Sequence, residues 1–550
     1  MQTTTEANKK KLPAAARWLI GYAAVLAACV GLVYYWRVAF MLTQLNALPF
    51  TLAVMGVFSL LYLALFFICR AKDISLRAAL CVFCLGVVFC FATAPLQAPD
   101  EGAHYLRAAA ISTGHFTYNY DEDWPEDIDL LRQHFPFFMN HTVAYQNGQL
   151  TPARLEAYFA DVQNGATAEK PADAPILFML LPFLHQGPFM AVARLFGGGA
   201  LAMLYAGRMA NLALYSLLCY FTFRGCARFR GVFIAVAMLP VSLFMAASCS
   251  YDGPMLALCF FLVSYVCRRQ VTGRDVVLFC VLLCLAVYIK PNNFVLAGVL
   301  LLVPKAAWQC RFKRWMVLAG MLAAAAVFYF ATGALNTSGF MLQGYPEELP
   351  RGEGTGPLAQ LLFVLKNPPR FLATALLSIY EADGFLFDLG RLGSMDLVVP
   401  LAGGLSVISL VVASALSIRQ KEDAKPGAVW GLFLVGLIYA AAVLAGIYVT
   451  QTGVGSVRIV GLQPRYFLPT FLLWGLVGSM LLGKAVRPRL DAASPLAHTE
   501  DITLWIAAAA ALLAGVLLFQ NYFVGQWLQT ADGSHKLVNM FGWVIGGAAG

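Results

Sequence analysis

Charged residues are scarce in this chain: Asp, Glu, Lys and Arg make up 12% of its 550 residues, whereas 60% are hydrophobic. So few charges cannot cover a water-soluble protein of this size, which excludes that class. Short segments that alternate polar and apolar residues are also missing, which excludes a membrane β-barrel. The apolar residues instead form about a dozen runs, each near the roughly 20 residues that a membrane-spanning helix needs. The composition therefore predicts an all-α polytopic membrane protein.

Cysteine is absent from the long polar loops. All 13 cysteines lie in or beside hydrophobic runs, among them Cys29, Cys259 and Cys284. This distribution gives no indication of a disulfide framework. Cys81 and Cys84 form a Cys-x-x-Cys pair, but the run around them offers no further ligands, so the pair indicates a packed helix face rather than a metal or redox site.

The net charge of +9 does not indicate nucleic acid, because most Lys and Arg residues stand at the ends of hydrophobic runs, as the positive-inside rule requires. The first run, residues 18–36, follows a basic segment and lacks a small-residue cleavage site, so we expect it to remain with its N-terminal end in the cytoplasm. Spans at residues 48–69 and 78–94 then place the following loop outside. That loop is rich in acidic residues, which suits the outer side.

Later hydrophobic runs bring the predicted total to about thirteen crossings. One of them is a single span from Val232 to Ser248. The segment at residues 175–195 is interrupted by Pro182 and Pro188, so we expect it to be re-entrant; a full span there would reverse the topology downstream. The predicted divisions are three N-terminal helices at 1–95, an acidic outer loop at 96–174, the re-entrant segment and central helices at 175–333, a second outer loop at 334–395, C-terminal helices at 396–520 and a tail at 521–550.

Several basic residues break the positive-inside rule, because the predicted topology puts them on or near the outer face. They are Arg208, Lys290, Arg391, Arg458 and Arg465. An arginine at a membrane boundary can bind a phosphate bidentately through its planar donors. For one arginine alone, snorkelling to lipid phosphates is an equally good interpretation. Several cations beside carboxylates favour a functional site.

Asp100 and Glu101 open the outer loop directly after the third span. One carboxylate is a candidate general base toward an acceptor hydroxyl, with His104 or Arg107 one turn later on the same helix face. The alternative is helix capping, since acids are favoured in the first turn of a helix. Asp252 joins the same outer face, or caps a helix of its own.

Four sequence blocks, in order, resemble a bacterial family of polytopic membrane proteins, domain of unknown function 2142. The blocks are Ala98-Pro99-Asp100-Glu101-Gly102-Ala103-His104-Tyr105-Leu106-Arg107-Ala108, Ser248-Cys249-Ser250-Tyr251-Asp252, Tyr288-Ile289-Lys290-Pro291 and Gly461-Leu462-Gln463-Pro464-Arg465-Tyr466-Phe467-Leu468-Pro469. The first resembles the family signature Pro-Asp-Glu-x-x-His-x-x-Arg-Ala. The resemblance spans residues 78–482, with Pro464 where the family more often has Gly.

The resemblance implies kinship with C-type glycosyltransferases of the GT-C fold, in a bacterial cytoplasmic (inner) membrane. Such enzymes transfer a sugar from a polyprenyl-phosphate carrier to a glycan, lipid or protein acceptor at the extracytoplasmic face, usually with inversion. Asp100 and Glu101 are the expected catalytic residues. The expected substrate-binding residues are His104, Arg107, Arg208, Tyr251, Asp252, Lys290, Arg391, Arg458, Gln463, Arg465 and Tyr466.

The metal requirement and the reaction class stay open at this point. Cationic side chains suffice for a carrier monophosphate, whereas a diphosphate favours a divalent cation such as Mg²⁺ or Mn²⁺. A transporter or flippase of lipid-linked sugars or other anions also fits a polytopic chain with buried charges. A polymerase or ligase for surface polysaccharide is the second alternative.

Overall fold

The structure is a computed structural model, which separates into two compact units. The first comprises Met1–Lys72 with Val524–Gln526, and the second comprises Asp73–Phe523 with Trp527–Gly550. The residues that the structure describes are 13–39, 47–116, 124–125, 127–135, 151–168, 180–340, 357–381, 391–392, 397–416, 426–459, 461–486 and 499–524.

The first unit contains two long apolar helices, α1 (Ala14–Ala39) and α2 (Ala47–Arg70), which pack against each other. The Trp18 ring meets the Tyr62 ring edge-on, with 5.4 Å between the centroids. The Tyr62 hydroxyl also donates a hydrogen bond of 2.7 Å to the Trp18 carbonyl. Aromatic contacts and interhelical hydrogen bonds, including one of 2.9 Å between the Tyr22 and Ser59 hydroxyls, therefore hold this pair together.

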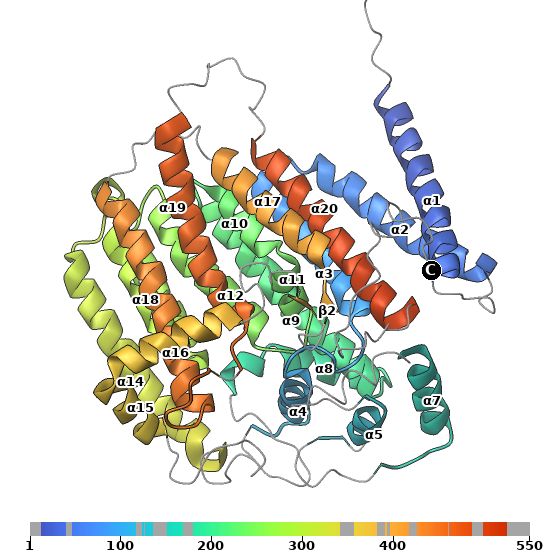
Figure 1. The fold of residues 1–550 in the computed structure, drawn as a ribbon. Helices are drawn as coiled ribbons and strands as arrows, with labels where there is room; N and C mark the ends of the chain where they lie inside the picture. The colour runs from blue at the N-terminus through green and yellow to red at the C-terminus, as the bar shows by residue number, and fades with distance from the viewer. Residues whose placement is uncertain are drawn as a thin grey trace, which may run out of the picture. The chain divides into compact units, whose positions relative to one another are not determined.

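The second unit is built around α9 (Ala200–Gly225), which packs against α3 (Ile74–Ala92), α8 (Gln186–Leu195) and α12 (Asp252–Val263) (Figure 1). The α12 helix is buried along its whole length. An apolar helix buried on all sides is typical of the centre of a bundle. The core of the unit thus lies along α9 and α12.

Short helices gather at the end of this unit where α9 begins, as Figure 1 shows. They are α4 (Glu101–Ser112), α5 (Asp127–His134), α7 (Thr151–Gln163), the 3₁₀ turn η1 (Leu181–Phe183) and α8. Their apolar side chains, among them Tyr105, Ile128 and Phe183, form one buried cluster with the start of α9. The α4 helix therefore packs against the bundle, and this packing fixes the position of its first turn.

The other elements of the second unit complete the bundle. They are α10 (Arg230–Ala237), α11 (Pro240–Ala246), η2 (Ser264–Cys267), α13 (Gly273–Ile289), η3 (Pro291–Leu302), η4 (Lys305–Ala307), α14 (Arg314–Phe340), α15 (Pro357–Lys366), α16 (Pro368–Glu381), β1 (Arg391–Leu392), β2 (Leu397–Val398), α17 (Pro400–Leu416), α18 (Pro426–Gln451), η7 (Pro464–Phe467), α19 (Leu468–Val486), α20 (Thr499–Phe519) and the π-helix η10 (Gln520–Val524). The strands β1 and β2 form one short antiparallel pair. The prediction of an all-α polytopic membrane protein is confirmed.

Eight described helices are long and apolar enough to cross a membrane, and three shorter apolar helices accompany them. We expected about thirteen crossings from the hydrophobic runs. The run from Val232 to Ser248 is not one continuous helix, because it divides into α10 and α11; that the run crosses the membrane stays a prediction. Pro240 begins α11, and a proline in the first turn ends the preceding helix, since it has no N–H to donate and restricts the residue before it. The six sequence divisions stay a prediction.

The segment that we expected to be re-entrant is described from Leu180 onward. It forms η1 and the ten-residue helix α8. A ten-residue helix extends about 15 Å, half of the hydrocarbon thickness. The α8 helix alone is therefore too short to span, and the re-entrant assignment of residues 175–195 stays a prediction.

Gly253 in the first turn of α12 lies directly against the backbone of α11. A Cβ atom added there would stand 2.6 Å from the Ala246 Cα and 2.9 Å from the Met245 oxygen. We predict that Gly253→Ala lowers the stability of the purified protein by about 1–3 kcal/mol, because backbone cannot yield as a side chain does. Thermal unfolding in detergent measures the effect. Gly273→Ala is the matched control, since a Cβ at Gly273 meets nothing within 4 Å; equal effects of the two substitutions would contradict the prediction.

Candidate functional site

The two adjacent carboxylates at the start of α4 have opposite environments. Asp100 has left-handed backbone, with φ of 60°, and its side chain makes no capping hydrogen bond. A non-glycine residue in this conformation is uncommon. The Asp100 carboxylate is 54% exposed, whereas the Glu101 side chain is fully buried. The Asp100 side chain therefore does not cap α4, contrary to the alternative interpretation of this residue.

Glu101 forms a bidentate ion pair with Arg208 of α9. The Arg208 Nε donates to Glu101 Oε1 at 2.8 Å, and Nη2 donates to Oε2 at 2.6 Å. The Cys249 backbone N–H also donates to Oε1, at 2.8 Å. Because both side chains are wholly buried, neither can meet a substrate in the structure.

Arg208 also forms hydrogen bonds with backbone carbonyls at the end of α3. Its Nη1 donates to the carbonyls of Cys90 and Thr93, and its Nη2 donates to that of Ala94. These carbonyls belong to the last turn of α3 and the residues after it, which have no partners within the helix. The pair thus joins α3, α4, α9 and the loop at Cys249. Its geometry gives Glu101 and Arg208 a positioning role rather than contact with a substrate.

A second cluster of charges lies next to the exposed carboxylate. Asp252, which begins α12, accepts a hydrogen bond of 2.6 Å from the Lys290 ammonium at the end of α13. The Asp252 Oδ2 atom is also 3.2 Å from the Nε of Arg465 in η7. Arg465 in turn donates through Nη2 to Asp100 Oδ2 at 3.1 Å. Four residues that are far apart in sequence therefore alternate in charge in one site.

Arg465 is 3% exposed, yet its Nε and Nη1 atoms have no hydrogen-bond partner among the described residues. The close approach of Nε to Asp252 is an ion contact that lacks hydrogen-bond geometry. A buried N–H without an acceptor costs free energy, so such a group is typical of a place where a ligand binds. The guanidinium can therefore offer two N–H directions to an anion.

Aromatic rings flank the cations. The Lys290 ammonium lies 4.4 Å from the centroid of the Tyr466 ring and 5.4 Å from that of Tyr251. The Arg465 guanidinium lies 5.0 Å from the Tyr466 centroid. Cation–π contacts of this kind hold a charged group without neutralising it. The tyrosine rings thus help to orient the two cations within the site.

His104 packs next to the cluster, against Tyr251. Its ring is 4.5 Å from the Tyr251 ring, and its Nδ1 forms a hydrogen bond of 3.0 Å with the Ser250 hydroxyl. Burial lowers the pKa of His104 to about 4, although Asp100 and Asp252 oppose this shift. The imidazole is therefore neutral near pH 7, where it serves as a hydrogen-bonding partner of Ser250.

The loop that carries Ser250 is held by polar residues that the sequence interpretation missed. Asn211 of α9 donates to the carbonyls of Ser248 and Ser250, at 2.8 Å and 2.6 Å. Gln186 of α8 donates to the Asn211 side chain at 3.1 Å. Asn211 could have been found from the sequence, because an amide within an otherwise apolar run must be buried and needs hydrogen-bond partners in the same protein.

Four further residues were predicted for the site: Arg107, Arg391, Arg458 and Gln463. Arg107 is buried and donates to the carbonyls of Phe116 and His115, which closes the loop after α4. Arg458 is exposed, with its backbone bonded to the Ser456 hydroxyl. Gln463 precedes η7, and its buried Oε1 has no hydrogen-bond partner within the ranges that the structure describes. Arg391 lies in β1, and its side chain is outside the described residues.

The described donors do not fit a divalent metal. Among the described residues, no group of three or more His, Cys, Asp or Glu side chains converges in a way that could hold an ion. Asp100 and Asp252 come nearest to such a group, and each already faces a cation. Within the described residues, these donors form no site for Mg²⁺ or Mn²⁺.

Fold and site together define a polytopic α-helical membrane protein with a charged cluster at the ends of its apolar helices. A family described as predicted membrane protein (DUF2142) matches residues 83–474, well over half of the chain. The chain belongs to this family, and the match contains all four resembling blocks. No curated protein and no solved structure matches the chain.

The two carboxylates are predicted to differ in their effect on stability. Glu101→Gln leaves the buried Arg208 charge without a counter-charge, so the free energy of unfolding should fall by about 3–5 kcal/mol. Asp100→Asn affects a half-exposed side chain and should change stability by less than about 1 kcal/mol. Unfolding of both variants in the same detergent measures the difference. Similar losses would contradict the roles that the geometry gives to the two residues.

The buried imidazole predicts a pH dependence. The unfolded chain binds a proton at His104 below about pH 6.5, whereas the folded protein binds it only near pH 4. Stability should therefore decline as the pH falls from 6.5 toward 4. His104→Asn should reduce this slope, as measured by thermal unfolding across the range, and His115→Asn is the control. An unchanged slope in His104→Asn would contradict the prediction.

Proposed function

We propose that this protein is an inverting membrane glycosyltransferase that moves a sugar from a polyprenyl-phosphate-linked donor to a cell-envelope acceptor. The observation that carries the proposal is the contact between the half-exposed Asp100 carboxylate and the buried Arg465 guanidinium, whose Nε and Nη1 lack hydrogen-bond partners in the described part of the chain. An inverting transfer needs a base for the acceptor hydroxyl and a cation for the leaving phosphate in one site, and these two residues supply both groups.

In the proposed reaction, Asp100 accepts the proton of an acceptor hydroxyl while that oxygen forms a bond to the anomeric carbon. The bond from this carbon to the phosphate oxygen breaks, and its electron pair stays on the phosphate. Arg465 and Lys290 stabilise the charge that develops there. Attack opposite to the leaving phosphate inverts the anomeric centre.

The other site residues orient these groups. Asp252 contacts both cations and keeps them together, at 2.6 Å from Lys290 and 3.2 Å from Arg465. Tyr466 and Tyr251 cover Lys290. Glu101 fixes the first turn of α4 through Arg208, which determines the direction of Asp100. In this scheme Glu101 acts through position and not through proton transfer.

The location of the site fits a lipid-linked donor. Asp252, Lys290 and Arg465 stand at the ends of apolar helices, where a polyprenyl tail can lie in the hydrocarbon while its phosphate reaches the cations. We propose that this end of the bundle faces the extracytoplasmic side of a bacterial cytoplasmic membrane. The basic residues that follow α9 and η2 would then face the cytoplasm, as the positive-inside rule requires.

Asp100→Asn is predicted to lower turnover at least about 100-fold, the usual scale for loss of a general base. Purified protein in liposomes is given a series of polyprenyl-phosphate-linked sugars, and released polyprenyl phosphate is measured with acceptor consumption. Glu156→Gln, an exposed acid on α7, is the control and should keep full activity. Undiminished turnover of Asp100→Asn would remove the base from the scheme.

Arg465→Lys is predicted to weaken donor binding in the same assay. The lysine keeps the charge but loses the planar donors, so both donor affinity and turnover should fall, by about 10- to 100-fold.

The same assay separates transfer from transport. Movement of an intact lipid-linked sugar across the bilayer without release of polyprenyl phosphate would contradict the proposal and favour a flippase. Elongation of a lipid-linked oligosaccharide would instead favour a polymerase.

A further inference from the structure

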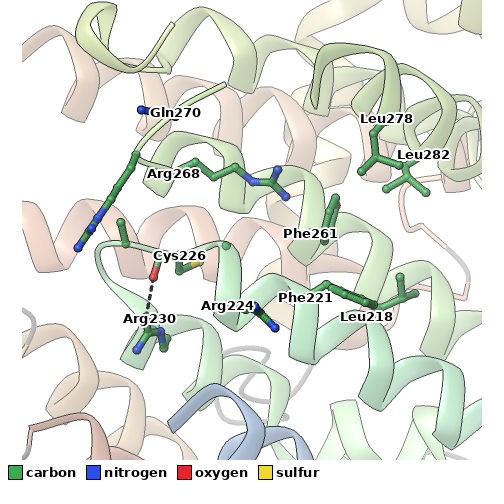
Figure 2. A pocket seen from close by; sticks show the side chains of 13 residues that line it. Leu218, Phe221, Arg224, Cys226, Arg230, Phe261, Arg268, Gln270, Leu278 and Leu282 are labelled. Atoms are coloured by element: carbon green, nitrogen blue, oxygen red, sulfur yellow. Dashed lines mark hydrogen bonds between the residues drawn. The ribbon is translucent and has the colours of Figure 1, made fainter. Parts of the chain in front are cut away.

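A second candidate site is a cavity at the far ends of the helices that carry the charged cluster. It has a volume of about 810 Å³ and lies between the end of α9, the end of α12 with η2, and the first half of α13 (Figure 2). Four arginines line it: Arg224, Arg230, Arg268 and Arg269. Figure 2 shows Arg224 beside Phe221 and Arg268 beside Phe261.

The chain path places this cavity away from the proposed active site. The α12 helix starts at Asp252 in that site and runs toward the cavity, and α13 starts beside the cavity and ends next to Lys290. Along α9, Arg224 follows Arg208 by about 24 Å at the helical rise of 1.5 Å per residue. The two sites thus lie at opposite ends of the same apolar helices.

Two of the four arginines are held by acids. Arg230 donates to Glu500 at 3.1 Å and to the Cys226 carbonyl at 3.1 Å. Arg268 donates to Asp275 at 3.1 Å, and its guanidinium lies 3.8 Å from the centroid of the Tyr265 ring. Both arginines line the cavity, and the acid that each contacts balances its charge.

The other two arginines carry charge that no described carboxylate balances. Arg224 is exposed and donates to the Tyr220 hydroxyl at 2.6 Å. Arg269 is exposed as well, and within the described parts of the chain neither residue forms an ion pair. The cavity therefore presents two uncompensated positive charges, which suit an anion.

The remaining wall is apolar and partly exposed. Phe221 is 48% exposed and Leu278 is 43% exposed, and Leu218, Leu282 and Phe261 extend the same surface. A small inorganic anion would gain nothing from these side chains, and an uncharged lipid would gain nothing from the arginines. A ligand with an anionic head and an apolar chain matches both parts of the wall.

We propose that this cavity binds one anionic glycerophospholipid of the bilayer. Arg224 and Arg269 contact its phosphodiester, and an acyl chain lies along Phe221 and Leu278. This site is separate from the proposed glycosyl transfer and stands whether or not that proposal holds, because no residue is shared between the two.

Native mass spectrometry of the protein in detergent tests the proposal, with dioleoylphosphatidylglycerol and dioleoylphosphatidylcholine as probes. Phosphatidylglycerol should bind about tenfold more tightly, and the double variant Arg224→Ala with Arg269→Ala should remove that preference. Leu278→Trp, which narrows the cavity without changing its charge, should also weaken binding severalfold. Inorganic phosphate at the same concentration should displace neither lipid.

The matched control removes two charges near the same helix ends but outside the cavity: Arg274→Ala with Lys313→Ala, both exposed. It should keep the preference for phosphatidylglycerol. Equal binding of the two lipids, an unchanged preference in the Arg224 and Arg269 double variant, or an equal loss in the control would overturn the proposal. Displacement by inorganic phosphate would likewise overturn it, since the ligand would then be an anion without a chain.

Discussion

The ion pair between Glu101 and Arg208 is the constraint on which the rest of the site depends. Two fully buried charges are costly to remove from water, and their attraction offsets that cost only if every donor and acceptor is satisfied. Here the guanidinium meets the carboxylate with two hydrogen bonds and three backbone carbonyls with its other donors. The pair therefore has one stable arrangement, which fixes the end of α3 against α4 and α9.

That arrangement also determines the direction of Asp100. Once Glu101 points into the bundle, the residue before it must turn away, and the left-handed backbone at Asp100 achieves the turn. A conformation of this kind in a non-glycine residue persists when its surroundings determine it. Burial of one carboxylate is thus the reason that its neighbour stands exposed beside Arg465.

The sequence was sufficient for the class of fold and for most of the charged cluster. Long apolar runs predict helices whatever their partners, and cations on the wrong side of the charge pattern singled out Lys290 and Arg465, which the structure brings together with Asp100 and Asp252. The sequence could not distinguish Asp100 from Glu101, because adjacent acids have the same local pattern and only the position of Arg208 separates them. The same limit applies to Arg107, whose partners are carbonyls of a later loop. The division between α10 and α11 could have been predicted from Pro240, since a proline ends the helix before it.

Cations occur at both ends of the bundle, but their surroundings differ in a way that separates two kinds of site. At the α4 end, Arg465 is buried between two carboxylates and has donors that no described residue accepts. A charge held in this manner cannot follow a mobile anion, so it suits a reaction that needs fixed geometry. At the far end, Arg224 and Arg269 are exposed on an apolar wall, where side chains adapt to a lipid headgroup. Burial, more than charge itself, therefore distinguishes the site proposed for chemistry from the one proposed for lipid binding.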